Sequence, residues 1–497
     1  MSTSCQHLPP SPKTPKKWRF TYESNSHIPV LRLYIFNHTD NINPSSEFTN
    51  LNATILFDKS LLQLTWVHND QTTSIWVPIP RVLIDPDSPI SLRALDDHVE
   101  VKFVLLLPVD HPLVSNFHFE DTSAENDQFQ PLQLDSDLKR LTWCGETYFY
   151  CRGCSTQLSR AVRTFKEMPS VNWREAADNW FGTCCCSFGG VSEKLVAKFA
   201  DSYTCSSGMC LLSVTSVVLC KDDLIGYKFP DNVEVHKSQE FIGINGLDKF
   251  ETLTINHGSE NECCHVNADE DQTPYYTSEV LANKASLLNG LIGNSFMVTS
   301  PYLSKDIKWS EILCPNCSCL LGAYPHDNID EPLKGSPLND GIHLFKCFIS
   351  TCLPVGGPTD LFRNYTLERM FTSHLLESAK DELSFRTVVR NLQTRSPMLQ
   401  IVLLNPNSWC SFGNCIDAMI PIPNILMYPM IKVLFSDCTD NTEFQSRKLD
   451  EWASKNQVDD VYMLTSKALA ESLKVANSML PSSHACLQGL SLSFLRM

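Results

Sequence analysis

The sequence predicts an α+β protein with an N-terminal antiparallel β domain, a cysteine-rich middle region and a mixed α/β C-terminal domain. Three observations predict it: short apolar runs at strand spacing before residue 108, two Cys-x-x-Cys pairs, and a helical apolar pattern after the second pair. Because the chain has 497 residues, we expect two or three domains of roughly 100 to 200 residues each.

The first part of the chain is predicted to be a tail followed by β structure. Residues 1–17 are rich in proline and carry a small basic cluster, which is typical of a disordered tail. Residues 110–137 are acidic and lack periodicity, which predicts a long loop before a strand at 141–150, so the β-rich domain covers residues 18–150. Before that loop, strand-like runs occupy 28–36, 53–58, 61–67, 74–80 and 98–107.

The composition argues against several classes of function. A formal net charge of -16 disfavours a nucleic-acid-binding face, because such faces need clustered Lys and Arg. The N-terminus lacks the apolar stretch of a secretory signal, and no apolar run is long enough to span a bilayer, so we expect a cytoplasmic protein without a membrane partner. There is no Walker loop, Gly-x-Gly-x-x-Gly fingerprint or Gly-x-Ser-x-Gly elbow, so nucleotide-driven and serine-hydrolase chemistry lack support.

Two cysteine pairs, Cys151/Cys154 and Cys314/Cys317, have the spacing of zinc knuckles. Zinc favours tetrahedral thiolate ligation, and each Cys-x-x-Cys turn can bring two thiolates to one ion, so two turns complete a closed structural site. We therefore expect a zinc-pinned region over residues 151–330. The alternatives are two buried, unligated thiol turns, or a thioredoxin-like redox pair, which is disfavoured because neither pair opens a clear βαβ helix.

A second group of thiols, the cysteine triplet 184–186, follows a predicted helix at 171–180. A thiolate is both a metal ligand and a nucleophile, so the triplet could complete a further zinc site, supply a nucleophile or simply be buried. Adjacent residues cannot all bind one ion comfortably, so one thiol can stay free even if the others bind metal. The Cys-Cys-His sequence at 263–265 lies in a polar stretch and is interpreted as an exposed loop.

Residues 331–497 are predicted to form the mixed C-terminal domain. Apolar residues follow helical spacing from Leu367 to Leu375, with Thr359 or Asp360 as the cap. His374 lies on the apolar face of this helix, where we expect a core histidine bonded to the backbone rather than a catalytic base. Strand-like runs at 383–390, 398–404 and 430–435, a helix near 466–479 and an alternating end at 490–495 complete the domain.

Five motifs occur in order over roughly residues 145–497. They are Phe149-Tyr150-Cys151-x-x-Cys154, Pro169-Ser170-x-Asn172-Trp173 leading to Trp180 and the cysteine triplet, Leu313-Cys314-x-x-Cys317 with Leu320-Leu321-Gly322, Ile431-Lys432-Val433-Leu434, and the terminal Phe494-Leu495-Arg496-Met497. In order and content they resemble the HECT-like ubiquitin ligase family described as ubiquitin-conjugating-enzyme-binding proteins.

The resemblance implies a ubiquitin-protein ligase that binds a ubiquitin-charged conjugating enzyme (E2) and accepts ubiquitin on its own cysteine before passing it to a substrate lysine. The implied partners are therefore an E2, ubiquitin and substrate proteins, and the resemblance suggests an E2 surface around residues 345–362. The family has Trp-Cys-Cys-His after the helix, whereas here Cys186 stands in place of the histidine and three residues follow Trp180. By position Cys185 matches the second family cysteine and is the candidate nucleophile.

The alternative is a non-catalytic, zinc-stabilised adapter that binds an E2 without forming a thioester. A RING-type ligase is disfavoured, because its interleaved ligand pairs are compact in sequence and nothing comparable occurs here. Ligase and adapter differ in covalent chemistry, since only the ligase forms a reducible ubiquitin adduct.

Overall fold

The computed structural model describes residues 18–37, 42–114, 132–168, 205–229, 295–300, 303, 307–327, 337, 340–416, 425–439 and 443–497. Over these residues helices are mixed with mostly antiparallel sheets, and strand predominates. No helix in this part of the chain is both long enough and apolar enough to cross a membrane. The tail at 1–17, the helix predicted at 171–180, the cysteine triplet and the 263–265 motif lie outside the described residues.

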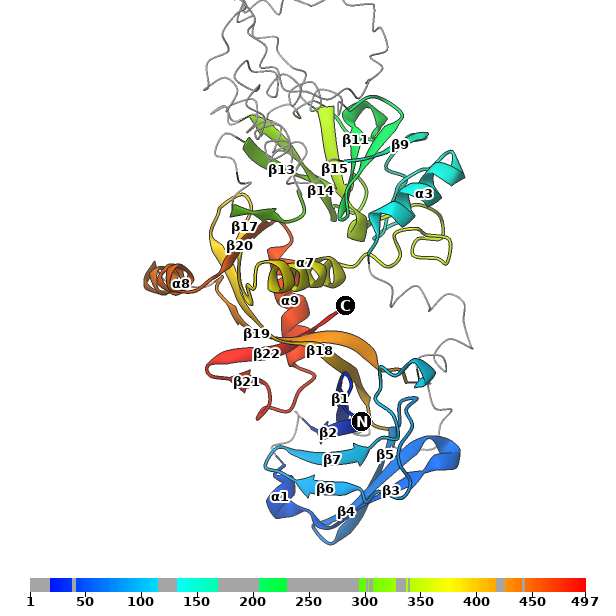
Figure 1. Ribbon diagram of the computed structural model, residues 1–497, viewed down its shortest axis with the longest axis vertical. Helices are drawn as coiled ribbons and strands as arrows, with labels where there is room; N and C mark the ends of the chain where they lie inside the picture. The colour runs from blue at the N-terminus through cyan, green and yellow to red at the C-terminus, as the bar shows by residue number, and fades with distance from the viewer. Residues whose placement is uncertain are drawn as a thin grey trace, which may run out of the picture.

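The largest sheet within the described residues has eleven strands and joins both ends of the chain (Figure 1). β1 pairs antiparallel with β18, with Tyr22 opposite Ser411, and Lys432 Nζ reaches Glu23 Oε1 at 2.6 Å across 409 residues of sequence. The strands of this sheet are β1 (Arg19–Asn25), β2 (Val30–Phe36), β6 (Ser91–Ala94), β7 (His98–Val104), β12 (Val298–Thr299), β17 (Arg386–Asn391), β18 (Pro397–Asn414), β19 (Tyr428–Asp437), β20 (Asp459–Met463), β21 (Cys486–Leu487) and β22 (Leu490–Arg496).

Three smaller sheets flank it, with the six-stranded sheet at one end of the molecule and the three-stranded sheet at the other (Figure 1). The six-stranded sheet comprises β9 (Thr164–Glu167), β10 (Met209–Leu212), β11 (Ser216–Cys220), β13 (Ile307–Leu313), β14 (Leu320–Asp327) and β15 (Gly341–Phe345). The three-stranded sheet comprises β3 (Thr49–Leu56), β4 (Leu61–His68) and β5 (Gln71–Pro78), and the two-stranded sheet pairs β8 (Tyr150–Cys151) with β16 (Ile349–Ser350).

The described helices are few and short. The two C-terminal helices predicted from the sequence are present, as α7 and α9. The α-helices are α1 (Pro44–Glu47), α3 (Leu134–Cys144), α7 (Leu367–Asp381), α8 (Glu443–Lys455) and α9 (Ser466–Asn477), and the 3-10 turns are η1 (Phe57–Lys59), η4 (Lys221–Asp223) and η7 (Lys346–Phe348).

The described residues form four buried apolar clusters, of which two are large. The N-terminal strands bury their own cluster around Trp18, Trp66 and Val101. The middle region and the C-terminal helices share one cluster, which runs from Phe149 beside β8 to Phe371 of α7. The middle region is therefore packed as part of the C-terminal half, because its side chains are removed from water by the same core.

The strand predicted at 141–150 is wrong except at Tyr150, where β8 begins. Residues 134–144 form α3, in which Asp137 and Leu141, four positions apart, are the buried residues. α3 ends at Gly145, whose φ of 72° is favourable only for glycine, and the chain reaches the short strand β8 at Tyr150. The helix therefore also begins inside the stretch that was predicted to be loop.

Two further details of α7 differ from the prediction. Its cap is Thr366, whose side chain accepts a hydrogen bond from the backbone of Arg369, and not Thr359 or Asp360. His374 pairs with a carboxylate instead of a backbone group, because its Nε2 lies 2.8 Å from Asp459 Oδ2 on β20. This pair joins α7 to the large sheet.

Candidate metal centre

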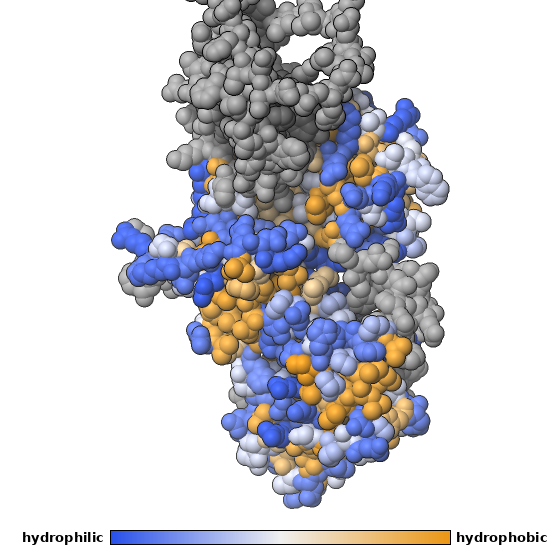
Figure 2. Space-filling view, viewed as in Figure 1, coloured by the Kyte–Doolittle hydropathy of each residue, from blue (hydrophilic) through white to orange (hydrophobic). Residues whose placement is uncertain are grey.

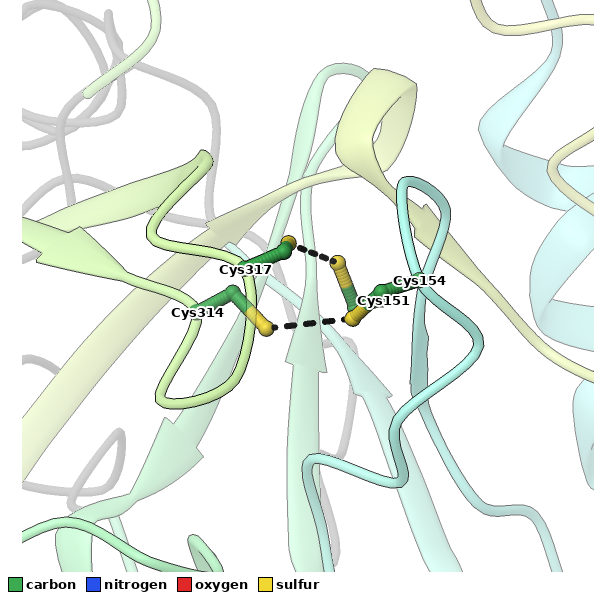
Figure 3. A group of neighbouring side chains, drawn as sticks. All are labelled: Cys151, Cys154, Cys314 and Cys317. Atoms are coloured by element: carbon green, nitrogen blue, oxygen red, sulfur yellow. Dashed lines mark hydrogen bonds between the residues drawn. The ribbon is translucent and has the colours of Figure 1, made fainter.

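The two Cys-x-x-Cys pairs predicted to act together meet in space. Their four sulfurs lie within 4.8 Å of one another, although 160 residues of sequence separate Cys154 from Cys314. Cys151 Sγ is 3.7 Å from Cys317 Sγ, and Cys154 Sγ is 3.5 Å from Cys314 Sγ. Figure 3 shows the side chains pointing toward one another from two facing loops.

The first loop is a tight turn closed by backbone hydrogen bonds. The amide of Cys151 donates to the carbonyl of Thr156 at 2.8 Å, and the amide of Ser155 donates back to the carbonyl of Cys151 at 2.8 Å. Ser155 has a φ of 61°, in the left-handed region that ordinary side chains rarely adopt. The turn therefore holds both sulfurs on one side at the cost of one strained residue.

The second loop repeats this turn. The amide of Cys314 donates to the carbonyl of Cys319 at 2.8 Å, and the amide of Ser318 donates to the carbonyl of Cys314 at 2.9 Å. Ser318 has a φ of 58° and occupies the same place after its second cysteine as Ser155 does in the first turn. Two segments far apart in the sequence thus adopt the same backbone conformation, as expected for two turns that would supply ligands to one ion.

The sulfur positions fit a tetrahedral metal ion. Zinc–sulfur bonds of about 2.3 Å at tetrahedral angles set neighbouring sulfurs about 3.8 Å apart. The two measured sulfur–sulfur distances, 3.5 and 3.7 Å, are close to that value and much longer than a disulfide bond of about 2.05 Å. The four thiols could therefore bind one metal ion and are not paired as disulfides.

Burial divides the four thiols into two pairs. Cys151 and Cys314 are 1% and 2% exposed, and burial raises the pKa of both thiols. The hydroxyl of Thr156 lies 3.2 Å from Cys154 Sγ, and its hydrogen bond lowers the pKa of Cys154 to about 6. Because metals bind thiolates, an ion entering this site must displace the protons that burial favours on Cys151 and Cys314.

Glycines bring the backbone close to the site. A Cβ at Gly153 would lie 3.5 Å from Cys319 Sγ and 3.6 Å from Cys317 Sγ. Behind the second turn, a Cβ at Gly322 would lie 1.9 Å from the carbonyl oxygen of His343, so only glycine fits there. Cys319 is thus a fifth thiol beside the cluster, which the Cys-x-x-Cys spacing does not reveal.

The segment after the second knuckle runs directly beside the first. β16 pairs with β8, with Ile349 opposite Cys151. Residues 345–350 are buried except for Phe348, whereas none of residues 351–359 is buried. Only the second part of the predicted surface at 345–362 is therefore available to a partner, and we name residues 351–359 the knuckle-side loop.

One buried carboxylate organises the knuckle-side loop. Asp360 is 1% exposed, and its Oδ1 accepts hydrogen bonds from the amides of Thr351 and Phe362 at 3.0 and 3.1 Å. Its Oδ2 accepts from the amide of Gly356 at 3.2 Å. The loop is consequently fixed from the inside, while Leu353 at its tip is 54% exposed.

Arg152 links the first knuckle to the ends of this loop. Its guanidinium donates to the carbonyls of Cys347, Tyr365 and Phe362 at 3.2, 2.8 and 2.5 Å, and it lies 3.6 Å from Asp360 Oδ2. Burial lowers the pKa of Arg152. The sequence analysis gave Arg152 no role, because no local pattern indicates its distant partners.

Cys185 lies outside the described residues, so its distance from the four thiols is not part of the described geometry. The described site consists of the four clustered thiols, Arg152 and the knuckle-side loop.

Comparison with known families connects this arrangement to ubiquitin transfer. A search of curated proteins finds no match, and neither does a search of solved structures. The family model described as HECT-like ubiquitin-conjugating enzyme (E2)-binding matches residues 23–251 and 259–492, which is most of the chain. The protein therefore belongs to the HECT-like E2-binding family.

Proposed function

We propose that this protein is a HECT-like ubiquitin-protein ligase that binds a ubiquitin-conjugating enzyme beside a structural zinc centre. The observation that carries the proposal is the position of the exposed knuckle-side loop, which is built directly on the first cysteine knuckle in a chain of the E2-binding family. The proposal includes a cytoplasmic location, because a chain with 21 cysteines suits a compartment that keeps thiols reduced.

Zinc is the metal we propose for the four cysteines. Four thiolates are the donor set of closed structural zinc sites, and soft thiolate ligands exclude the oxygen-preferring ions Mg²⁺ and Ca²⁺. With all four positions taken by protein, Cys151, Cys154, Cys314 and Cys317 leave no open position for a substrate. The ion would therefore hold the two loops together and take no part in the transfer chemistry.

The E2 docking surface is proposed to be the knuckle-side loop, with Leu353 as its central contact. Exposed apolar side chains alone do not distinguish it, since Figure 2 shows apolar surface over several parts of the molecule. The loop differs because Asp360 and Arg152 fix its conformation, and a fixed loop loses little conformational entropy when a partner binds.

The transfer step is proposed to use Cys185. Its thiolate would attack the carbonyl carbon of the E2–ubiquitin thioester, so that a new carbon–sulfur bond forms, the bond to the E2 sulfur breaks, and the E2 cysteine leaves as a thiolate. A substrate lysine amine would then attack the new thioester, lose a proton and release Cys185. One thioester is exchanged for another, so positioning of the partners is the main task of the protein.

A non-catalytic adapter remains the second candidate. The E2-binding description of the family supports binding for both candidates, and the four-cysteine cluster serves both equally well. Only a covalent adduct separates them.

The first experiment measures binding of wild-type protein to a panel of E2 enzymes. Leu353→Asp is expected to weaken binding at least tenfold, because hot-spot residues contribute roughly 2 kcal/mol or more. Leu383→Asp is the matched control, since Leu383 is 69% exposed but follows α7, away from the loop in sequence. Absence of binding to every E2 would overturn the proposed function, and equal effects of the two substitutions would overturn the docking surface.

The second experiment looks for the adduct on a non-reducing gel with charged E2. Wild-type protein is expected to give a thiol-sensitive ubiquitin adduct that Cys185→Ala abolishes and Cys144→Ala retains, since Cys144 is an exposed thiol at the end of α3. All three proteins must first bind equal zinc. E2 binding without any adduct would favour the adapter.

A further inference from the structure

The contacts of Arg152 join two features that have so far been described separately. Arg152 stands between two metal-binding cysteines, so metal binding constrains its backbone. Its side chain donates to the carbonyls of Cys347, before the knuckle-side loop, and of Phe362 and Tyr365, after it. One side chain therefore connects the metal knuckle to both ends of the loop.

The chemistry of these contacts requires an arginine. A guanidinium is a planar fork with five N–H donors, so it can reach several carbonyl oxygens in a fixed arrangement. The side chain of Arg152 is 22% exposed, and the carboxylate of Asp360, 3.6 Å away, supplies the opposite charge. A lysine ammonium on its flexible stem could satisfy one of these acceptors but could not reproduce the fork.

Asp360 extends the contacts of Arg152 into the knuckle-side loop. Its Oδ2 lies 3.6 Å from the guanidinium of Arg152 and also accepts from the amide of Gly356, while its Oδ1 accepts from the amide of Thr351. Movement of the guanidinium would remove the charge that balances this buried carboxylate, and an unbalanced buried charge is costly. The conformation of the loop therefore depends on the position of the Arg152 side chain. That position depends in turn on the backbone of the first knuckle.

We propose that Arg152 makes the conformation of the knuckle-side loop depend on metal binding by the four cysteines, so that the metal-loaded protein alone presents a preformed docking surface. This inference rests on the proposed function for the role of the loop in binding an E2, but the coupling itself is a property of the chain alone. Arg152 acts as a positioning residue in it.

The expected size of the effect follows from population arithmetic. If metal loss leaves the loop in its docking conformation about a tenth of the time, the apparent affinity for an E2 falls about tenfold, with no contact to the partner removed. The same loss should appear in the free protein as faster hydrogen exchange of the loop amides, because local opening exposes them to water.

The test measures hydrogen exchange and zinc content of the full-length protein with and without zinc. In the wild type, zinc removal is expected to speed exchange at Gly356 and Phe362, whose amides are bonded to Asp360. Arg152→Met should bind zinc as the wild type does, show fast exchange at these amides in the presence of zinc, and change little when zinc is removed. Arg152→Lys is expected to lie between them.

The control is Arg163→Met, because Arg163 is 73% exposed and makes a surface pair with Glu146. This variant should respond to zinc removal as the wild type does. The coupling is overturned if wild-type loop amides stay protected after zinc removal, or if zinc removal speeds exchange as much in Arg152→Met as in the wild type. The first of these outcomes needs no variant, so a misfolded substitution cannot rescue the inference.

Binding measurements separate this inference from the proposed function. If the wild type binds an E2, Arg152→Met is expected to bind about tenfold more weakly and to be insensitive to zinc removal, whereas the wild type loses affinity with its zinc. If no E2 binds but the exchange pattern appears, the coupling holds and the docking role fails. If an E2 binds equally with and without zinc, the coupling has no bearing on docking and the proposal is wrong.

Discussion

Lys346 Nζ lies 2.7 Å from Asp137 Oδ2 in an ion pair that water does not reach. Lys346 is 0% exposed and packs over the rings of Phe362 and Tyr365, and the hydroxyl of Tyr365 donates to the same carboxylate oxygen at 2.5 Å. Burial lowers the pKa of Lys346. The pair joins α3 to the strand and turn that lead into the knuckle-side loop, 209 residues later in the sequence.

Removal of one partner of this pair should destabilise the protein strongly. Lys346→Met leaves the carboxylate of Asp137 buried without its cation, which costs about 3–5 kcal/mol. Adding Asp137→Leu and Tyr365→Phe removes the remaining polar groups and should restore most of that loss, since apolar replacement of a buried pair is often neutral. Urea denaturation of the single and triple variants measures both. A triple variant as unstable as Lys346→Met would show that packing, not charge, causes the loss.

Metal content tests the cysteine site. Purified protein should contain about one zinc ion in the four-thiolate site, and Cys151→Ser and Cys314→Ser should each lose it. The midpoint of thermal unfolding should fall by about 10 °C, because metal loss can exceed roughly 4 kcal/mol and each kcal/mol moves the midpoint of a 150–250-residue unit by 2–4 °C. Cys144→Ser, an exposed thiol outside the site, is the control. Unchanged metal and midpoint in both ligand variants would exclude a shared ion.

The left-handed backbone conformation of Ser318 in the second knuckle predicts which substitutions this position tolerates. Ser318 has a φ of 58°, so Ser318→Gly should be neutral or slightly stabilising, whereas Ser318→Val should cost about 1–3 kcal/mol and weaken zinc retention. Zinc release by a competing chelator measures the second effect. If valine is tolerated as well as glycine, the turn conformation is not what holds the sulfurs in place.

The pair between α7 and the large sheet predicts a dependence of stability on pH. Burial raises the pKa of Asp459, but hydrogen bonds from His374 and Ser378 outweigh burial and leave that pKa below its usual value. Asp459 therefore stabilises the fold fully above about pH 3.9, and this contribution is lost as the pH falls through its lower folded-state pKa.

Asp459→Asn checks this directly. At pH 7 the variant should be less stable than the wild type by roughly 1–3 kcal/mol, and the difference should shrink below about pH 4. Urea midpoints at several pH values measure it, with Asp381→Asn on the exposed end of α7 as the control. A difference that stays constant with pH would show that the carboxylate charge is not involved.

Local patterns predicted the local parts of this structure. Period-two alternation predicted the strand that begins at His98, helical spacing predicted α7, and Cys-x-x-Cys spacing predicted the four thiols that converge. The strand, the helix and each single Cys-x-x-Cys turn depend on residues close together in the sequence, whereas the meeting of the two turns was expected because a closed zinc site needs four ligands. Their success reflects the fact that burial on one face imposes a visible period.

The remaining features depend on distant partners and left no local signal. α3 was missed because its acidic residues suggested a loop, although Asp137 is buried against Lys346. β18 (Pro397–Asn414) extends well beyond the predicted 398–404, because its second half also pairs with β1, which is distant in sequence. Asp360 was predicted as a possible helix cap, but its carboxylate accepts hydrogen bonds from amides of the preceding loop.

The pairing of β1 with β18 also means that the large sheet can form only after most of the chain has been synthesised. Tyr22 emerges early but waits for Ser411, and at roughly 5–20 residues per second that interval lasts about 20 to 80 s. During this time the β1–β2 hairpin has one open edge, which other nascent chains can join. Until β18 has been made, the open edge of the N-terminal hairpin is therefore a site where non-native strand pairing is possible.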